Sequence, residues 1–289
     1  MSTLARNARS YVELTKPRVL LLVIFTGLPA MVLAGGAWPA PAFAASVLLG
    51  ITLAAGAANA LNCYIERDRD ARMERTRNRP LPGARMKPGS ALAFGLVLAA
   101  VATGILWAAG GGMAAALGLA TILFYVFVYT VWLKPRSSWN AVIGGAAGAA
   151  APLIADAAVD GRVGPAGLLL FAIVFLWQPP HVWAIALFRK DDYARAGIPM
   201  LPNVIGDQPT RWRMLGYSLA LVPVTLAPLP LGLLGPLYGV VAAMLGAWFV
   251  WHSVRVLRER TDAAARRMFG VSLVYLFALF LAMLVDFSL

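Results

Sequence analysis

The sequence has little charge and almost no cysteine, and each shortage excludes a class of protein. Only 13% of its 289 residues are charged, whereas a soluble domain carries about a quarter. The single cysteine, Cys63, excludes disulfides and cysteine-based metal centres, and we interpret it as a small buried apolar residue. The chain therefore has the composition of neither a soluble domain nor a disulfide-linked scaffold.

Long apolar runs stand in place of the missing charge, and 60% of the residues are hydrophobic. We identify nine runs, each near the roughly 20 residues that a helix needs to cross the hydrocarbon core of a bilayer. The runs cover residues 18–36, 41–63, 90–109, 112–133, 139–158, 165–187, 213–233, 236–254 and 268–287. Because backbone groups in lipid must hydrogen-bond internally, these runs should be helices. We predict an all-α, polytopic membrane protein with nine transmembrane helices around a central cavity, in one domain of residues 1–289.

The lysines and arginines gather in alternate loops. They precede the first run and follow the second, fourth, sixth and eighth runs, and only Arg162 lies in a loop of the other set. Basic loops usually mark the cytoplasmic side of a membrane. We therefore predict a protein of the cell (inner) membrane whose N-terminus is cytoplasmic and whose C-terminus is on the opposite side. This placement argues against nucleic acid as the reason for the net charge of +12.

The densest charged segment follows the second run and reads NCYIERDRDARMERTRNRPLP. Asn62, Glu66 and Asp70 are four residues apart, so a continuing helix places them on one face, and Asp68 can join them where the helix ends. Clustered carboxylates suit Mg²⁺ that is also bound by phosphate oxygens, and the interspersed arginines match phosphate geometry. The alternative is a loop of mutual salt bridges that attracts anionic lipid.

A second acidic segment, FRKDDYARAGIPMLP, follows the sixth run on the same predicted face. It places Asp191 and Asp192 among basic residues, and the loop after the fourth run adds Lys134 and Arg136. Two acidic segments at one membrane surface can each hold a Mg²⁺ against one diphosphate, where metals stabilise the leaving group. With a hydrocarbon tail in the membrane, such a ligand is a polyprenyl diphosphate.

Departure of that diphosphate leaves an allylic carbocation, which must be kept from water until an acceptor attacks it. Aromatic ring faces stabilise positive charge in a dry cavity. Six aromatic residues are candidates for this wall, although each is also typical of a core or of a membrane interface. They are Phe124, Tyr125, Tyr129, Trp132, Trp177 and Trp183.

The two acidic segments resemble the two Asp-rich motifs of the UbiA superfamily of intramembrane prenyltransferases. Within this superfamily, three segments resemble the branch that farnesylates heme: RMERTRNRPLP, WNAVIGGAAGAAAPLI and FLWQPPHVWAIALFRKDDYARAGIPMLP. The resemblance covers nearly the whole chain. It implies Mg²⁺-assisted transfer of the farnesyl group of farnesyl diphosphate to a vinyl group of heme b, with water completing a hydroxyethylfarnesyl side chain. A quinone precursor or chlorin is the alternative acceptor, and a transporter without catalysis is the alternative class.

The resemblance also implies roles for individual residues. The implied metal ligands are Asn62, Glu66, Asp68, Asp70, Asp191 and Asp192, with Glu66 standing where aspartate is common. The implied diphosphate-binding residues are Arg75, Arg79, Lys134 and Lys190. Asn140, at the start of the fifth run, either caps that helix or joins them. We expect catalysis to depend on Asn62, Asp70, Asp192 and His181. The expected partners are farnesyl diphosphate, heme b and the lipid bilayer, with a heme A synthase as a candidate.

Two further features of the apolar runs have open interpretations. His181 lies within the sixth run, where an ionisable group is a functional candidate. Three roles are open for it: to contact heme, to position the water and accept its proton at the vinyl cation, or to hydrogen-bond backbone groups left unpaired by the two preceding prolines. His252 we interpret mainly as an interfacial residue. Gly144 and Gly148 predict close helix packing, with room for a flat ligand as the alternative.

Overall fold

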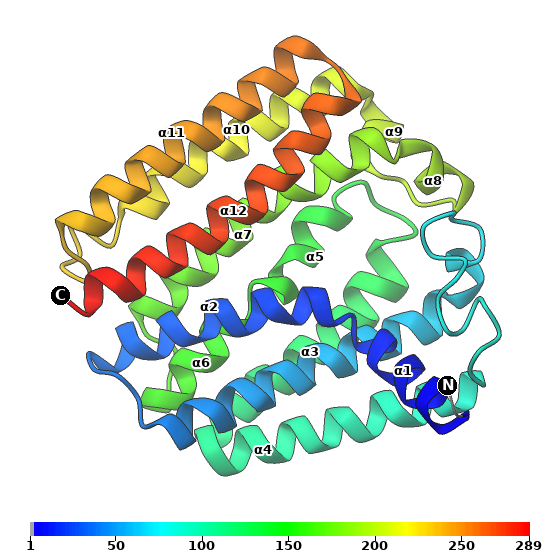
Figure 1. The fold of residues 1–289 in the computed structure, drawn as a ribbon, viewed down its shortest axis with the longest axis horizontal. Helices are drawn as coiled ribbons and strands as arrows, with labels where there is room; N and C mark the ends of the chain where they lie inside the picture. Colours follow the sequence, from blue (N-terminus) through cyan, green and yellow to red (C-terminus); the bar gives the residue numbers. More distant parts are fainter. Residues whose placement is uncertain (1–2) are drawn as a thin grey trace.

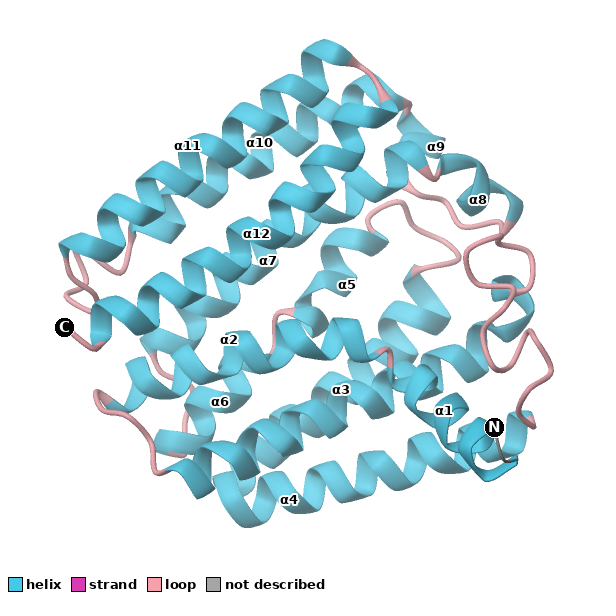
Figure 2. Cartoon of the chain, viewed as in Figure 1, coloured by secondary structure: helices cyan, strands magenta, loops and turns pink. Residues whose placement is uncertain are grey.

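The computed structural model describes residues 3–289, and every regular element within that range is helical (Figures 1 and 2). A π-helix, η1, continues α4 without a break. The elements are α1 (Thr3–Thr15), α2 (Pro17–Gly35), α3 (Pro41–Asp70), α4 (Pro88–Leu123), η1 (Phe124–Leu133), α5 (Asn140–Gly148), α6 (Ala151–Asp160), α7 (Pro165–Phe188), α8 (Lys190–Arg195), α9 (Leu201–Ile205), α10 (Asp207–Leu226), α11 (Pro236–Glu259) and α12 (Asp262–Phe287). The prediction of an all-α protein is confirmed.

The described chain contains six helical segments that are long and apolar enough to cross a membrane, or seven if α1 and α2, bent by 55°, form one span. One segment, Pro88–Leu133, has 46 residues, about 70 Å as a straight helix, which far exceeds a bilayer. It folds back at Gly111, whose backbone is not helical (φ 78°, ψ −179°). The two arms then pack so closely that a Cβ on Gly118 would lie 2.5 Å from Leu106. Dividing this segment at Gly111 gives seven segments, and α2 together with α10, whose first turns are polar, bring the number to nine. The nine predicted runs therefore correspond to nine segments of residues 3–289.

The fifth predicted run is broken in the middle of the bundle. It forms two short helices, α5 and α6, separated at residues 149–150. In Figure 1 these helices lie between a layer formed by α7 and α10 to α12 and a layer formed by α2 to α4. Close contacts tie α6 to α2, α4 and α7, and tie α5 to η1 and α7. The surrounding helices thus enclose the centre, as predicted.

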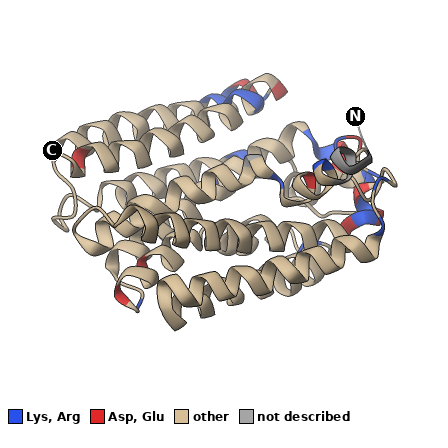
Figure 3. Ribbon diagram, turned by 60° about the horizontal axis from the view of Figure 1, so that its bottom comes forward, with Lys and Arg blue, Asp and Glu red and all other residues tan. Residues whose placement is uncertain are grey.

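The two ends of the bundle differ in charge (Figure 3). Most lysines and arginines lie at the end that holds the N-terminus, the loop of residues 71–87 and α8, whereas the C-terminus lies at the other end. At that second end, Asp286 accepts hydrogen bonds from the backbone N–H groups of Gly235 and Tyr238 and so completes the start of α11. Asp156 accepts one from Gly164 beside the start of α7. Two of the few acids there, Asp156 and Asp286, thus have structural partners.

Candidate active site

Helix α3 extends beyond its apolar part and carries the first acidic segment into the charged end. Its thirty residues end at Asp70, so Asn62, Glu66 and Asp70 lie on one continuous helical face, as predicted. All three side chains are buried, with exposed fractions of 1 to 2%. They line a cavity of about 260 Å³. Its other walls are Lys16, Val19, Asn59, Arg75, Arg79, Tyr125, Tyr129, Lys134, Asn140, Val182, Tyr193 and Met200.

Two of the predicted cations pair with carboxylates of this face. Lys134 Nζ, just after η1, lies 2.6 Å from Glu66 Oε2, and an Arg79 guanidinium nitrogen lies 2.7 Å from Asp70 Oδ2. Burial, the largest single effect, lowers the pKa of Lys134, but Glu66, Tyr129 and Tyr125 together raise it by more, so the pKa lies above its ordinary value. Burial and the Asp70 carboxylate compete in the same way at Arg79, whose pKa is also raised. Both cations therefore remain charged beside the cavity.

Three buried carboxylates of the site each keep one oxygen without a hydrogen-bond partner. These atoms are Glu66 Oε1, Asp70 Oδ1 and Asp192 Oδ2. Buried polar atoms are nearly always satisfied in proteins, so the free oxygens of Glu66 and Asp70 beside the cavity favour a cationic ligand there. Asp192 Oδ2 has a guanidinium nitrogen of Arg189 at 3.8 Å. The anionic, oxygen-only donors match what Mg²⁺ prefers. The residues therefore fit the metal implied by the sequence.

The metal ligands alone do not form a complete cluster. Within residues 3–289, no three carboxylate, imidazole or thiolate groups are grouped closely enough to hold a metal ion by themselves. Mg²⁺ typically binds proteins through one or two carboxylates and takes its other ligands from phosphates and water. The arrangement therefore suits a metal that arrives with a phosphate-bearing substrate.

The second acidic segment lies against the first. Asp192, at the start of α8, is 3% exposed and is paired with Arg195. It also accepts a hydrogen bond of 3.3 Å from the backbone N–H of Glu74, 118 residues earlier in the sequence. The Arg75 guanidinium lies 5.2 Å from the ring centre of Tyr193, and both of these residues line the cavity. The two segments thus meet at one cavity, as the diphosphate hypothesis requires.

Four predicted ligands lie at this end but do not line the cavity, and one of them, Asp192, is buried. Asp68 and Asp191 are exposed neighbours of buried carboxylates. Lys190 is exposed and its Nζ lies 3.1 Å from a carboxylate oxygen of Asp207 on α10. Their assignment to the metal and to diphosphate remains a prediction.

Asn140 lines the cavity but does not cap its helix in the predicted way. It is the first residue of α5 and is 1% exposed. Its amide nitrogen donates to the carbonyl oxygens of Ser137, at 2.6 Å, and Pro199, at 3.5 Å. This residue therefore ties the loop before α5 to the segment that follows α8.

His181 faces a different side of α7 from the cavity. Its Nδ1 lies 2.7 Å from the Ser272 hydroxyl of α12, and its ring packs against Trp177 and Phe269 at centroid distances of 4.5 and 4.9 Å. The neighbouring Val182 lines the cavity instead. The structure therefore does not bring His181 together with the other predicted catalytic residues.

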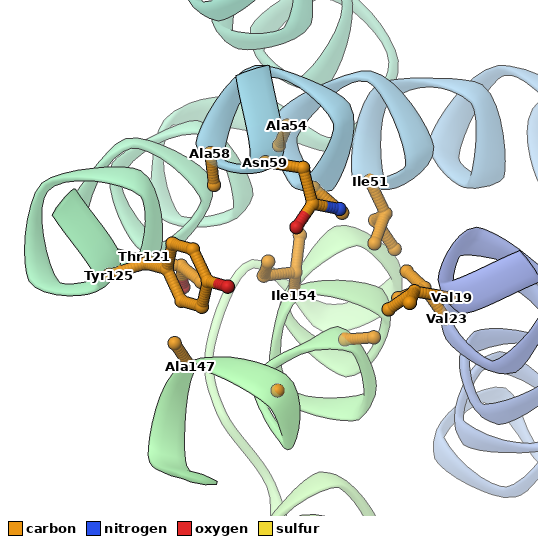
Figure 4. Close-up of a pocket in the computed structure, with 13 residues that line it drawn as sticks. Val19, Val23, Ile51, Ala54, Ala58, Asn59, Thr121, Tyr125, Ala147 and Ile154 are labelled. Atoms are coloured by element: carbon orange, nitrogen blue, oxygen red, sulfur yellow. The ribbon is translucent and has the colours of Figure 1, made fainter. Parts of the chain in front are cut away.

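An apolar cavity adjoins the polar one (Figure 4). Its volume is about 100 Å³, and Val19, Asn59 and Tyr125 line both cavities. Its remaining walls are Val23, Ile51, Ala54, Ala55, Ala58, Thr121, Ala147, Gly148, Ala151 and Ile154. This arrangement provides a hydrocarbon-lined space directly beside the buried carboxylates.

Two of the six candidate aromatics line the polar cavity. The rings of Tyr125 and Tyr129 have centroids 5.1 Å apart. Trp132 is 59% exposed on the outside of the bundle, whereas Trp183 packs against Tyr217 in the core. Gly144 leaves room for the Tyr129 ring, because a Cβ at residue 144 would overlap the ring carbons. The predicted close packing at Gly144 thus supports a wall of the cavity.

Sequence reasoning missed Lys16, Asn59 and Tyr193, all of which line the cavity. Asn59 was detectable, since it is a polar residue in an apolar run and precedes Asn62 by one helical turn. Lys16 and Tyr193 gave no comparable signal, because a basic residue before a transmembrane helix and a tyrosine after one are common at membrane surfaces.

The fold and cavity define a class: a multi-pass, all-helical membrane protein with two acidic segments converging beside an apolar space. The sequence profile of the UbiA prenyltransferase family matches residues 22–284. The chain belongs to that family and is a prenyltransferase.

Relatives in this family are similar over nearly the whole length. The protoheme IX farnesyltransferase of Acidiphilium cryptum is 48% identical, with 99% of this chain and 92% of the relative covered. The protoheme IX farnesyltransferase of Symbiobacterium thermophilum is also 48% identical, with 96% and 94% covered. The resemblance to the heme-farnesylating branch is confirmed.

Solved structures share the fold at low sequence identity. A digeranylgeranylglyceryl phosphate synthase has a TM-score of 0.80 at 16% identity, with 99% of both chains covered. A UbiA homolog from Archaeoglobus fulgidus bound to DMAPP and Mg²⁺ has a TM-score of 0.67 at 17% identity, with 96% of this chain and 99% of the other covered. These similarities confirm the UbiA-type architecture.

Proposed function

We propose that the protein transfers the farnesyl group of farnesyl diphosphate to a vinyl group of protoheme IX, which is heme b, to give heme O and diphosphate. The observation that carries the diphosphate chemistry is the meeting of two acidic segments beside an apolar cavity. The choice of acceptor and prenyl donor rests on the names of relatives that are 48% identical over nearly the whole chain.

The buried carboxylates are the proposed metal ligands. Glu66 and Asp70 each have one oxygen free for a cation, and Asn62 lies on the same helical face. Asp192 Oδ2 also lacks a hydrogen bond, but an Arg189 guanidinium nitrogen lies 3.8 Å from it. Asp68 and Asp191 would join them only through water or after a side-chain rotation, since both are exposed. When bound, Mg²⁺ neutralises oxygens of the diphosphate as negative charge develops on the leaving group.

The basic side chains around the cavity bind the diphosphate in this proposal. Arg75 and Arg79 present planar guanidinium groups that match phosphate oxygens, and Lys134 adds a point charge. Asn140 completes the wall beside them. Lys190 lies outside the cavity and acts at its rim.

The apolar cavity accommodates part of the prenyl chain and excludes water from the reacting carbon. The bond between C1 and oxygen breaks with its electron pair passing to diphosphate, and the faces of Tyr125 and Tyr129 stabilise the resulting allylic cation. The vinyl electrons then form a bond to C1. Water adds to the cation left on the acceptor and loses a proton, which completes the hydroxyethylfarnesyl group.

The proposed location is the cell (inner) membrane, with the N-terminus and the mouth of the site cytoplasmic and the C-terminus on the opposite side. The concentration of lysine and arginine at the N-terminal end of the bundle supports this orientation (Figure 3). We treat residues 1–289 as one domain. A heme A synthase is a candidate partner, because it would consume the product.

Mass spectrometry of a reconstituted reaction tests the function. Purified protein, heme b, farnesyl diphosphate and Mg²⁺ should yield the hydroxyethylfarnesyl adduct of heme, and a quinone precursor offered instead should yield no prenylated product. Asp70→Ala and Asp192→Ala should insert normally but yield no adduct, whereas Glu259→Ala, which changes a residue that lines neither cavity, should behave as wild type. Full turnover by Asp192→Ala would refute its place in the metal site.

A further inference from the structure

The break between α1 and α2 places a strained residue at the edge of the polar cavity. Lys16 separates the two helices and has left-handed backbone angles, φ 56° and ψ 64°. Residues other than glycine rarely adopt this conformation, because Cβ approaches a carbonyl oxygen. Such strain persists only where the surrounding structure holds the residue, and it is often found at functional sites.

The surroundings that hold Lys16 belong to α3. The Asn59 amide donates a hydrogen bond of 3.0 Å to the carbonyl oxygen of Thr15, which the break leaves without a helical partner. Lys16 Nζ then donates one of 2.8 Å to Asn62 Oδ1, and Asn62 donates one of 3.1 Å to the Thr130 hydroxyl. The break therefore docks on the helical face that carries the buried carboxylates, and it directs the ammonium into the cavity.

The charge of Lys16 lacks the partner that neighbouring cations have. Lys134 pairs with Glu66 and Arg79 pairs with Asp70, but Lys16 forms an ion pair with none of the described carboxylates. It donates to a neutral amide oxygen, although an ammonium has three donors. A partly buried cation with unused donors, facing a cavity, is suited to an anionic ligand.

We propose that Lys16 is a substrate-binding residue that donates to the diphosphate while it fixes the amide of Asn62. This assignment rests on the proposed prenyl transfer. It adds a cation from a third part of the chain to Lys134, which follows η1, and to the arginines of the 71–87 loop. The competing explanation is structural: the lysine would serve only to join the α1–α2 break to α3. Under the proposal, the affinity for diphosphate falls when the positive charge at residue 16 is removed. Under the structural explanation, that affinity does not depend on the charge.

Calorimetric titration of the purified protein with inorganic diphosphate and Mg²⁺ separates these explanations. Lys16→Met should weaken binding by about 10- to 100-fold, as expected for the loss of a charged hydrogen-bond donor. The KM for farnesyl diphosphate should rise with it, and Lys16→Arg should recover much of the affinity. Lys87→Met removes an exposed cation of the same membrane face and serves as the matched control, with wild-type affinity expected.

Lys16→Gly adds an independent readout, because glycine relieves the left-handed strain. This variant should unfold at or above the temperature of Lys16→Met and should still bind diphosphate weakly. Wild-type affinity in either Lys16→Met or Lys16→Gly would overturn the inference and leave the proposed function intact. Failure of the wild-type protein to bind diphosphate or to transfer farnesyl would instead overturn the proposed function and the inference with it.

Discussion

The Glu66–Lys134 pair allows a quantitative test of the site, because both groups are nearly inaccessible. Glu66 is 2% exposed and Lys134 is 13% exposed, with 2.6 Å between Nζ and Oε2. Truncation by Lys134→Met leaves the Glu66 carboxylate buried without its cation, which should cost about 3–5 kcal/mol of unfolding free energy. Glu66→Gln should cost less, about 1–3 kcal/mol, since the longer lysine can reach solvent at the charged end.

The double variant, Glu66→Gln with Lys134→Met, buries no unpaired charge. It should therefore be more stable than Lys134→Met alone, with a coupling energy of about 2 kcal/mol or more. Prenyl transfer should be lost in all three variants, because each removes a group that the proposed mechanism uses. The double variant would thus recover stability relative to Lys134→Met but would not recover activity.

Unfolding free energies can be measured by titrating the detergent-solubilised protein with SDS, in EDTA so that metal binding does not contribute. Arg255→Met is the matched control, since the Arg255–Glu259 pair is 30% and 36% exposed and should contribute under about 1 kcal/mol. If Lys134→Met unfolded like this control, the buried pair would not exist as described. A double variant that regained turnover would refute the role of the pair in catalysis.

Three further outcomes follow from the structure. Gly144→Val should displace the Tyr129 ring, because a Cβ at residue 144 would overlap the ring carbons, and should lower turnover at least tenfold with normal membrane insertion; normal turnover would refute this role. Asp286→Ala should remove the cap that binds the N–H groups of Gly235 and Tyr238 and cost about 1–2 kcal/mol, measured by SDS titration, without a change in turnover. EDTA should abolish farnesyl transfer, and added Mg²⁺ should restore it; turnover that persists in EDTA would contradict a role for the metal.

The membrane fold was predictable because lipid leaves few solutions. Long apolar runs must form helices when water is absent, and the alternation of basic loops fixes which ends lie together. The common face of Asn62, Glu66 and Asp70 was also predictable, since the helical repeat places residues four apart side by side. These features depend on local sequence and on the solvent alone.

Burial within each acidic segment was not predictable. Asp192 is buried and Asp191 is exposed, and Asp70 is buried while the nearby Asp68 is exposed. Residues so close in sequence differ mainly in the direction of their side chains. That direction decides which of them is buried only when another segment packs on one side of the helix. The Glu74–Asp192 hydrogen bond, across 118 residues, supplies that partner here.

The sequence by itself therefore determined the membrane, the helices and the common face of the acids, because hydropathy and helical spacing are properties of short segments. Only the tertiary structure decided which acids keep a free oxygen, that His181 faces α12, and that Lys16 enters the cavity. Each of these facts depends on contacts between residues far apart in the chain, which no short segment specifies.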